Sequence, residues 1–196
     1  MGLIRRMSMV GLMAMMCCAA GAQSGGGKST EDANCGIVYG KGHAFTICAP
    51  KGWVLDNGIM HDEGIYAAFY PKGSSWTKAK DAGSVMYVNT VGKHKGMESV
   101  EALMKTDAEQ TRVTAEGVEV QPGEPIETKD GKALVQKFEH SAYDRTEAVA
   151  YIDTPKVIVM IAMSSKDDKT FAADYAKYVE LVKSYKFLTT DVRMKK

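Results

Sequence analysis

Three possible metal ligands follow one another in the sequence at His61, Asp62 and Glu63. Imidazole and carboxylate groups bind divalent metal ions, but consecutive side chains alternate across a strand or splay from a turn, so they seldom converge on one ion. The ordinary interpretation is a solvated loop, and a metal or ligand contact is the alternative. We expect no cofactor and keep these three residues as the metal-ligand candidates.

A basic loop flanked by glycines, Gly92–Gly96, contains Lys93, His94 and Lys95. It precedes a helical pattern that begins at Met97, and a helix start with cations nearby can hold an anion. The phosphate-loop motif Gly-x4-Gly-Lys-Ser/Thr does not occur in the sequence. The loop is therefore either a plain connector or an anion site.

The residue types of a serine hydrolase triad occur close together at His140, Ser141 and Asp144. Such residues act together only in a specific geometry, and the Gly-x-Ser-x-Gly elbow that often presents the nucleophile does not occur in the sequence. We therefore predict that the chain is not an enzyme.

Four aromatic residues, Trp53, Tyr70, Trp76 and Tyr87, lie near proposed turns and strands. They could line a groove for a peptide or a saccharide, although aromatic side chains near a Pro-Gly turn more often pack in the core. We keep Tyr70, Trp76 and Tyr87 as a candidate binding surface.

The N-terminus has the three parts of a secretory signal peptide. Arg5 and Arg6 precede an apolar run, Met7–Ala20, and the small residues Ala20 and Ala22 suit a cleavage site. The run is shorter than the roughly 20 residues that span a bilayer as a helix. We predict that residues 1–22 are removed and that the mature chain has no membrane span.

Cysteine positions agree with export. Cys17 and Cys18 could carry a lipid, but methionines precede them where a lipid-attachment signal has small residues. Maturation would leave only Cys35 and Cys48, which in an oxidising compartment most simply form one disulfide. The predicted location is therefore periplasmic or secreted.

Composition divides the rest of the chain into a linker, one domain and a short tail. Residues 23–34 are polar and glycine-rich, which is typical of a flexible linker, and residues 35–190 form one predicted domain with a tail at 191–196. The formal net charge is +1, and it becomes −1 without Arg5 and Arg6. This near-neutral balance gives no electrostatic reason to expect a nucleic-acid partner.

The elements that would position these residues are short strands and two longer helices. Hydrophobic patterning and turn residues predict strands at 36–39, 44–48, 65–70, 84–91, 125–128, 132–140, 146–153 and 156–163. Both faces of 84–91 are apolar, which indicates a central strand, and the last four strands form an antiparallel meander. Helical spacing predicts a helix at 97–113 lying on a sheet, a closing helix at 167–188, and a short serine-capped turn at 74–79.

Two segments, 45–53 (Phe-Thr-Ile-Cys-Ala-Pro-Lys-Gly-Trp) and 67–73 (Ala-Ala-Phe-Tyr-Pro-Lys-Gly), carry a family resemblance. Together with the order of elements, they resemble the PsbP-like superfamily of extrinsic photosystem proteins, Ran-binding Mog proteins and DcrB-type envelope proteins. The resemblance implies an α+β fold, an antiparallel sheet flanked by helices in an α/β/α sandwich. It also implies a binding or assembly role without a shared catalytic site.

The leading hypothesis is an exported, non-enzymatic binding or assembly protein of the cell envelope. Its partner would be another envelope protein, bound at a sheet edge or at the loop from Tyr70 to Trp76. The alternative is a periplasmic small-ligand or metal-binding module that uses His61, Asp62 and Glu63 or the His94 loop.

Overall fold

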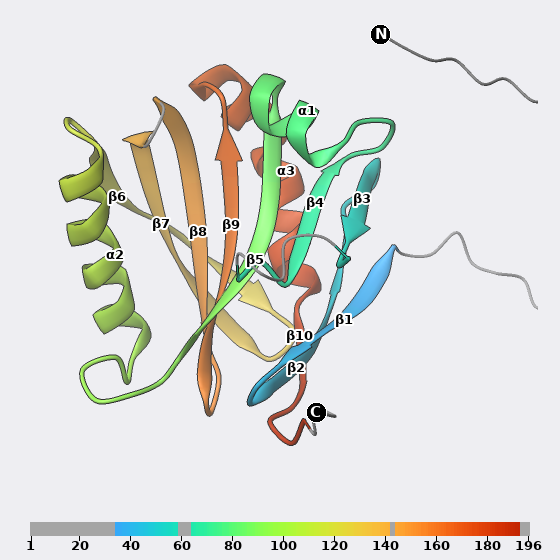
Figure 1. Ribbon diagram of the computed structural model, residues 1–196, viewed down its shortest axis with the longest axis vertical. Coiled ribbons are helices and arrows are strands. Elements are labelled where there is room, and N and C mark those ends of the chain that lie inside the picture. The colour runs from blue at the N-terminus through green and yellow to red at the C-terminus, as the bar shows by residue number, and fades with distance from the viewer. Residues whose placement is uncertain (1–33, 59–63, 142–143, 193–196) are drawn as a thin grey trace, which may run out of the picture. The chain divides into compact units, whose positions relative to one another are not determined.

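Two antiparallel sheets and three helices make up the part of the chain that the computed structural model describes, residues 34–58, 64–141 and 144–192 (Figure 1). These residues belong to one compact unit, 32–196. The helices are α1 (Trp76–Ala82), α2 (Val100–Thr114) and α3 (Asp168–Ser184). The predicted signal peptide, nearly all of the predicted linker, the end of the tail, and His61, Asp62 and Glu63 lie outside the described residues.

Seven strands form the large sheet in the order β3-β4-β5-β9-β8-β7-β6. Their bounds are β3 (Trp53–Asp56), β4 (Ala67–Pro71), β5 (Ser84–Gly92), β6 (Glu119–Thr128), β7 (Gly131–Ser141), β8 (Arg145–Asp153) and β9 (Val157–Ser165). After β5 the chain passes through α2 to the far edge and returns through the meander to pair β9 with β5. The predicted meander and the predicted central strand are both confirmed.

Side chains of the large sheet alternate between two apolar layers, and a helix covers each layer. On β9, Val159 and Ile161 face the core that includes the buried residues of α3, whereas Ile158 and Ala162 face the core that includes Val100 and Leu103 of α2. This period-two alternation is what a strand covered on both sides requires. The protein therefore has the predicted α+β fold with helices on both faces of an antiparallel sheet (Figure 1).

The small sheet has the order β1-β2-β10, with β1 (Cys35–Gly40), β2 (His43–Cys48) and β10 (Lys186–Thr189). A two-residue turn joins β1 to β2, and Gly42 adopts a φ of +82°, which suits the second central residue of a type II turn. Cys35 and Cys48 are opposite residues in the register and form the predicted disulfide, which links the two ends of the hairpin.

The predicted closing helix is too long. It ends at Ser184, because Tyr185 is extended at φ −55° and ψ 133°, and the following residues pair with β2 as β10. The Tyr185 ring is fully buried and lies 5.1 Å from the ring of Phe45. Backbone pairing with β2 replaces the helical hydrogen bonds that an amphipathic pattern through Leu188 had predicted.

Other element boundaries also shift. α2 begins at Val100 rather than at Met97, because Met97 forms an isolated bridge with His94 and Ser99 caps the helix. β6 begins at Glu119, well before the predicted strand, although Pro122 and Gly123 interrupt its apolar pattern. It can carry these residues because, among the strands that the structure describes, it is an edge strand that pairs with β7 alone.

Candidate functional site

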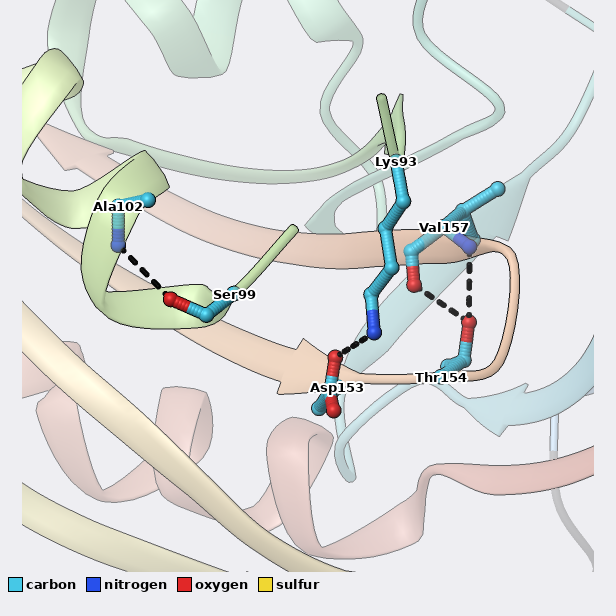
Figure 2. Close-up of polar contacts among 6 residues, drawn as sticks. All are labelled: Lys93, Ser99, Ala102, Asp153, Thr154 and Val157. Atoms are coloured by element: carbon cyan, nitrogen blue, oxygen red, sulfur yellow. Dashed lines mark hydrogen bonds and ion pairs between the residues drawn. The ribbon is translucent and has the colours of Figure 1, made fainter. Parts of the chain in front are cut away.

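The Lys93 loop lies where β5 ends, and an ion pair determines where Lys93 points. Its Nζ is 2.5 Å from Oδ1 of Asp153 at the end of β8, and its side chain is only 20% exposed (Figure 2). Its backbone N–H also donates to the carbonyl of Lys156, at 3.0 Å. The strand pairing of β5 with β9 therefore places Lys93 against the β8–β9 turn.

The other residues of the predicted anion site are arranged differently. His94 and Lys95 are exposed, and Nδ1 of His94 lies 3.0 Å from the carbonyl oxygen of Lys95. At the start of α2, the Ser99 hydroxyl accepts from the N–H of Ala102 at 3.2 Å (Figure 2). The side chain of Lys93 is therefore held by its ion pair, whereas those of His94 and Lys95 are exposed. One of the backbone N–H groups at the start of α2, which could otherwise bind an anion, already donates to the Ser99 hydroxyl.

An open cleft of about 660 Å³ contains Lys93 together with two lysines that sequence reasoning did not single out. It is lined by Lys41, Gly42, Gly92, Lys93, Pro155, Lys156, Val157, Thr190, Asp191 and Val192. These residues come from the β1–β2 turn, the end of β5, the β8–β9 turn and the C-terminal segment. No local signal could have identified Lys41 or Lys156, because each is an ordinary turn lysine far from the others in sequence.

The candidate aromatic surface is divided between the two faces of the large sheet. Trp53 is 7% exposed and belongs to the core on the α3 side, so the packing interpretation is correct for it. Tyr87 pairs with Ala68 on the other face, and the ring of Trp76 stands edge-on to it at 6.1 Å. Burial is the main cause that raises the pKa of Tyr87, so its hydroxyl stays protonated at neutral pH.

Tyr70 has a partner within its own hairpin. Its hydroxyl donates to Oδ2 of Asp56 at 2.9 Å, and this hydrogen bond is the main cause that raises the pKa of Tyr70. Trp76 and Tyr70 are half-buried. The aromatic binding surface formed by Tyr70, Trp76 and Tyr87 stays a prediction, with Trp76 and Tyr87 as its contacting pair.

The edge of the small sheet exposes apolar side chains that sequence reasoning did not select. Ile37 and Tyr39 on β1 are 54% and 57% exposed. They border a groove of about 610 Å³ that is also lined by Val38, Gly40, Lys41, Asn57 and Tyr66. The sequence predicts residues 36–39 as one strand of a hairpin, but local sequence could not show that, among the described strands, this one would pair with β2 alone.

A buried histidine begins β2 within this hairpin. His43 is 1% exposed, its ring stands edge-on to Tyr66 at 5.0 Å, and Phe45 stacks on it at 5.9 Å. Burial lowers the pKa of His43, against a smaller opposing effect of the Lys41 backbone. The folded protein therefore favours the neutral form of the His43 imidazole.

The residues of the hydrolase triad do not assemble. Nδ1 of His140 lies 2.7 Å from Oδ1 of Asp144, and this carboxylate raises the pKa of the exposed histidine. Ser141 is 3% exposed, so its hydroxyl points into the protein while the His140 ring is on the surface. A nucleophile turned away from its base cannot transfer a proton to it.

Metal and membrane sites can be assessed only for the described residues. Among residues 34–58, 64–141 and 144–192, no group of three or more His, Cys, Asp or Glu side chains is placed to hold a metal ion. His61, Asp62 and Glu63 lie outside these ranges, so the metal-ligand candidates stay a prediction. No helix within the same ranges has the length and apolar character needed to cross a membrane.

Fold and site together define an α/β/α protein with an exposed edge strand and a lysine-lined cleft. Among solved structures it is similar to cyanobacterial PsbP (CyanoP) from Synechocystis sp. PCC 6803, with 9% identity, 84% of this chain and 98% of that chain covered, and a TM-score of 0.48. It is also similar to the Ran-binding protein Mog1p of Saccharomyces cerevisiae, with 12% identity, coverage of 81% and 98%, and a TM-score of 0.47. Both belong to the PsbP-like group that the sequence resembles, and at these identities the likeness is one of fold alone. No family model and no curated protein matches the sequence.

Proposed function

We propose that this chain is an exported, non-enzymatic binding or assembly protein of the cell envelope that binds an extended segment of a partner protein along the edge of β1. The observation that carries the proposal is the exposure of Ile37 and Tyr39 on that edge, beside the groove of about 610 Å³. Exposed apolar edge strands favour unwanted pairing, so proteins usually cover or charge them. A partner strand would cover this one.

The backbone of β1 supports strand addition. The two-residue turn makes Gly40 and His43 the closing hydrogen-bonded pair, so bonded and non-bonded pairs alternate along the hairpin. By this alternation, the N–H and C=O groups of Ile37 and Tyr39 point away from β2. An added strand could pair with these groups and place its side chains in the groove, which is the usual form of recognition by β-augmentation.

Support for export comes from the sequence and from the hairpin. The signal-peptide pattern of residues 1–22 predicts secretion, and the Cys35–Cys48 disulfide is of a kind that persists in oxidising compartments. Cell fractionation and N-terminal sequencing test this part. We expect the protein outside the cytoplasm with Gln23 as its first residue, and a cytoplasmic protein that starts at Met1 would refute it.

A photo-crosslinking amino acid tests the binding edge in the native envelope. Placed at Tyr39, it should give a discrete crosslinked protein. Placed at Val113, an apolar residue on α2 that is 86% exposed, it should not. The Val113 control separates a specific edge contact from the general stickiness of an exposed apolar side chain.

A proline on the edge makes the test sharper. Ile37→Pro removes an N–H that points away from β2, and an edge strand tolerates proline at such a position. We expect the crosslink from Tyr39 to be lost in this variant while its circular dichroism spectrum stays unchanged. A crosslink that survives Ile37→Pro, or that forms equally from Val113, would contradict binding by strand addition.

A further inference from the structure

Three lysines from separate parts of the chain line the cleft of about 660 Å³. Lys41 comes from the β1–β2 turn, Lys93 from the end of β5 and Lys156 from the β8–β9 turn. The two turns lie close together, because a Cβ added at Gly42 would lie only 3.4 Å from Cβ and Cδ of Lys156. The cleft therefore brings together cations that are more than 50 positions apart in the sequence.

The positive charge of this cleft is only partly balanced. Asp153 pairs with Lys93 from outside the cleft, and Asp191 is the one carboxylate among the lining residues that the structure describes. Within the described residues, no ion pair involves Lys41 or Lys156. The three lysines and two aspartates together leave a surplus of one positive charge, which favours a bound anion over a bound cation.

The walls of the cleft are held in place before any ligand binds. The Thr154 hydroxyl donates to the carbonyl of Val157 at 2.5 Å and its oxygen accepts from the N–H of Val157 at 3.3 Å, which closes the β8–β9 turn (Figure 2). The backbone bond from Lys93 to Lys156 ties this turn to β5. Two of the three lysines therefore start from fixed backbone positions, which lowers the cost of ordering a site around a ligand.

We propose that this cleft binds a phosphate group carried by a small organic molecule. Lysine ammonium groups act as separate point charges and suit the tetrahedral oxygens of phosphate, whereas a planar carboxylate is matched better by the fork of an arginine. Among the residues that the structure describes, the lining contains lysines and no arginine. Pro155 and Val192 provide an apolar surface for the carbon part of the ligand, and the volume is within the usual range for small-molecule sites.

Nuclear magnetic resonance titration of the purified full chain with glycerol 3-phosphate tests the proposal, with glycerol as the uncharged control. We expect saturable shifts of the amide signals of Gly42, Gly92 and Val157 with the phosphate ester and none with glycerol. The affinity should fall as salt is added, because a partly exposed charge pair is screened.

One lysine variant isolates the charge from the packing. Lys156→Met keeps most of the side-chain stem that lies against Gly42 and removes the ammonium group. We expect it to weaken glycerol 3-phosphate binding about tenfold, as loss of one charge-assisted contact would. Lys78→Met is the matched control, because Lys78 is an exposed lysine on α1, which precedes the opposite end of β5.

Vesicles of phosphatidylcholine with and without phosphatidylglycerol identify the source of the phosphate. Sedimentation with the anionic vesicles that depends on Lys156 would make a lipid headgroup the source, and binding in solution alone would make it a free metabolite. The proposal is overturned if neither arm shows binding that depends on Lys156, or if Lys78→Met weakens binding equally. Lys156 does not line the β1 groove, so this failure would leave the strand-addition proposal standing.

Discussion

His43 should make the stability of the β1–β2 hairpin depend on pH. Its imidazole is buried against the rings of Phe45 and Tyr66, and burial lowers its pKa below the ordinary value of 6.5. Between the folded-state pKa and 6.5, the unfolded chain therefore binds more protons than the folded chain. The free energy of unfolding is fully retained above pH 6.5 and falls as the pH drops below it.

The size of this effect has a firm upper limit. One proton gives at most about 1.4 kcal/mol for each pH unit below 6.5, and the loss stops once the pH passes the folded-state pKa. The His43→Leu variant replaces the titrating ring with a leucine side chain of similar volume. Between pH 7.5 and 5.5 the wild-type protein should therefore lose up to about 1.4 kcal/mol more than the leucine variant.

Urea unfolding at these two pH values measures the difference. Other titrating groups, His140 among them, are present in both proteins and cancel in the comparison. If His43→Leu does not fold, His43→Gln serves as a second neutral replacement. An equal loss of stability in the wild-type and variant proteins would refute the assignment of this pH dependence to His43.

Three further predictions can be tested by the same urea unfolding assay. Reduction of the disulfide should lower the free energy of unfolding by about 3 kcal/mol, the chain-entropy value for so short a loop, and an unchanged urea midpoint would contradict this. Tyr151→Phe should cost about 1.5 to 3 kcal/mol at pH 7, because the hydroxyl donates at 2.7 Å to Asp107, whose pKa burial raises; Tyr70→Phe, at a half-buried hydrogen bond, is the control and should cost less. Gly40→Ala should cost about 1 to 3 kcal/mol in the same assay, since its Cβ would lie 2.5 Å from the His43 ring, and a stability equal to wild type would show that the ring can move aside.

Most elements of the fold can be predicted from local sequence patterns. The Gly40–His43 turn separates two short apolar runs, and the strands from residue 131 to 165 follow one another through tight turns. Both kinds of signal are local, because neighbouring strands in a meander pair with the next segment in the chain. The amphipathic spacing of α2 and α3 likewise needs no information about distant residues.

The end of α3 shows where local patterning fails. Tyr185 continues the helical stripe of Phe171, Tyr175, Tyr178 and Val182, so periodicity alone extends the helix. In the folded protein, the edge of β2 offers backbone partners to residues 186–189, and the Tyr185 ring enters the core beside Phe45. This competition between a helix and a distant strand edge is decided by segments more than 130 positions apart in the sequence.

The features of the candidate sites likewise fall into those that local sequence identifies and those that depend on tertiary structure. Sequence alone identified Lys93 as a basic residue beside a helix start, the Cys35–Cys48 pair and the amphipathic strands, because residue type and short-range spacing carry those signals. Only the tertiary structure showed which strand has a free edge, which tyrosines are exposed, and that Lys41 and Lys156 join Lys93 in one cleft. The physical reason is that edges and clefts arise from the pairing of distant strands and turns, and no single segment of the chain contains that information.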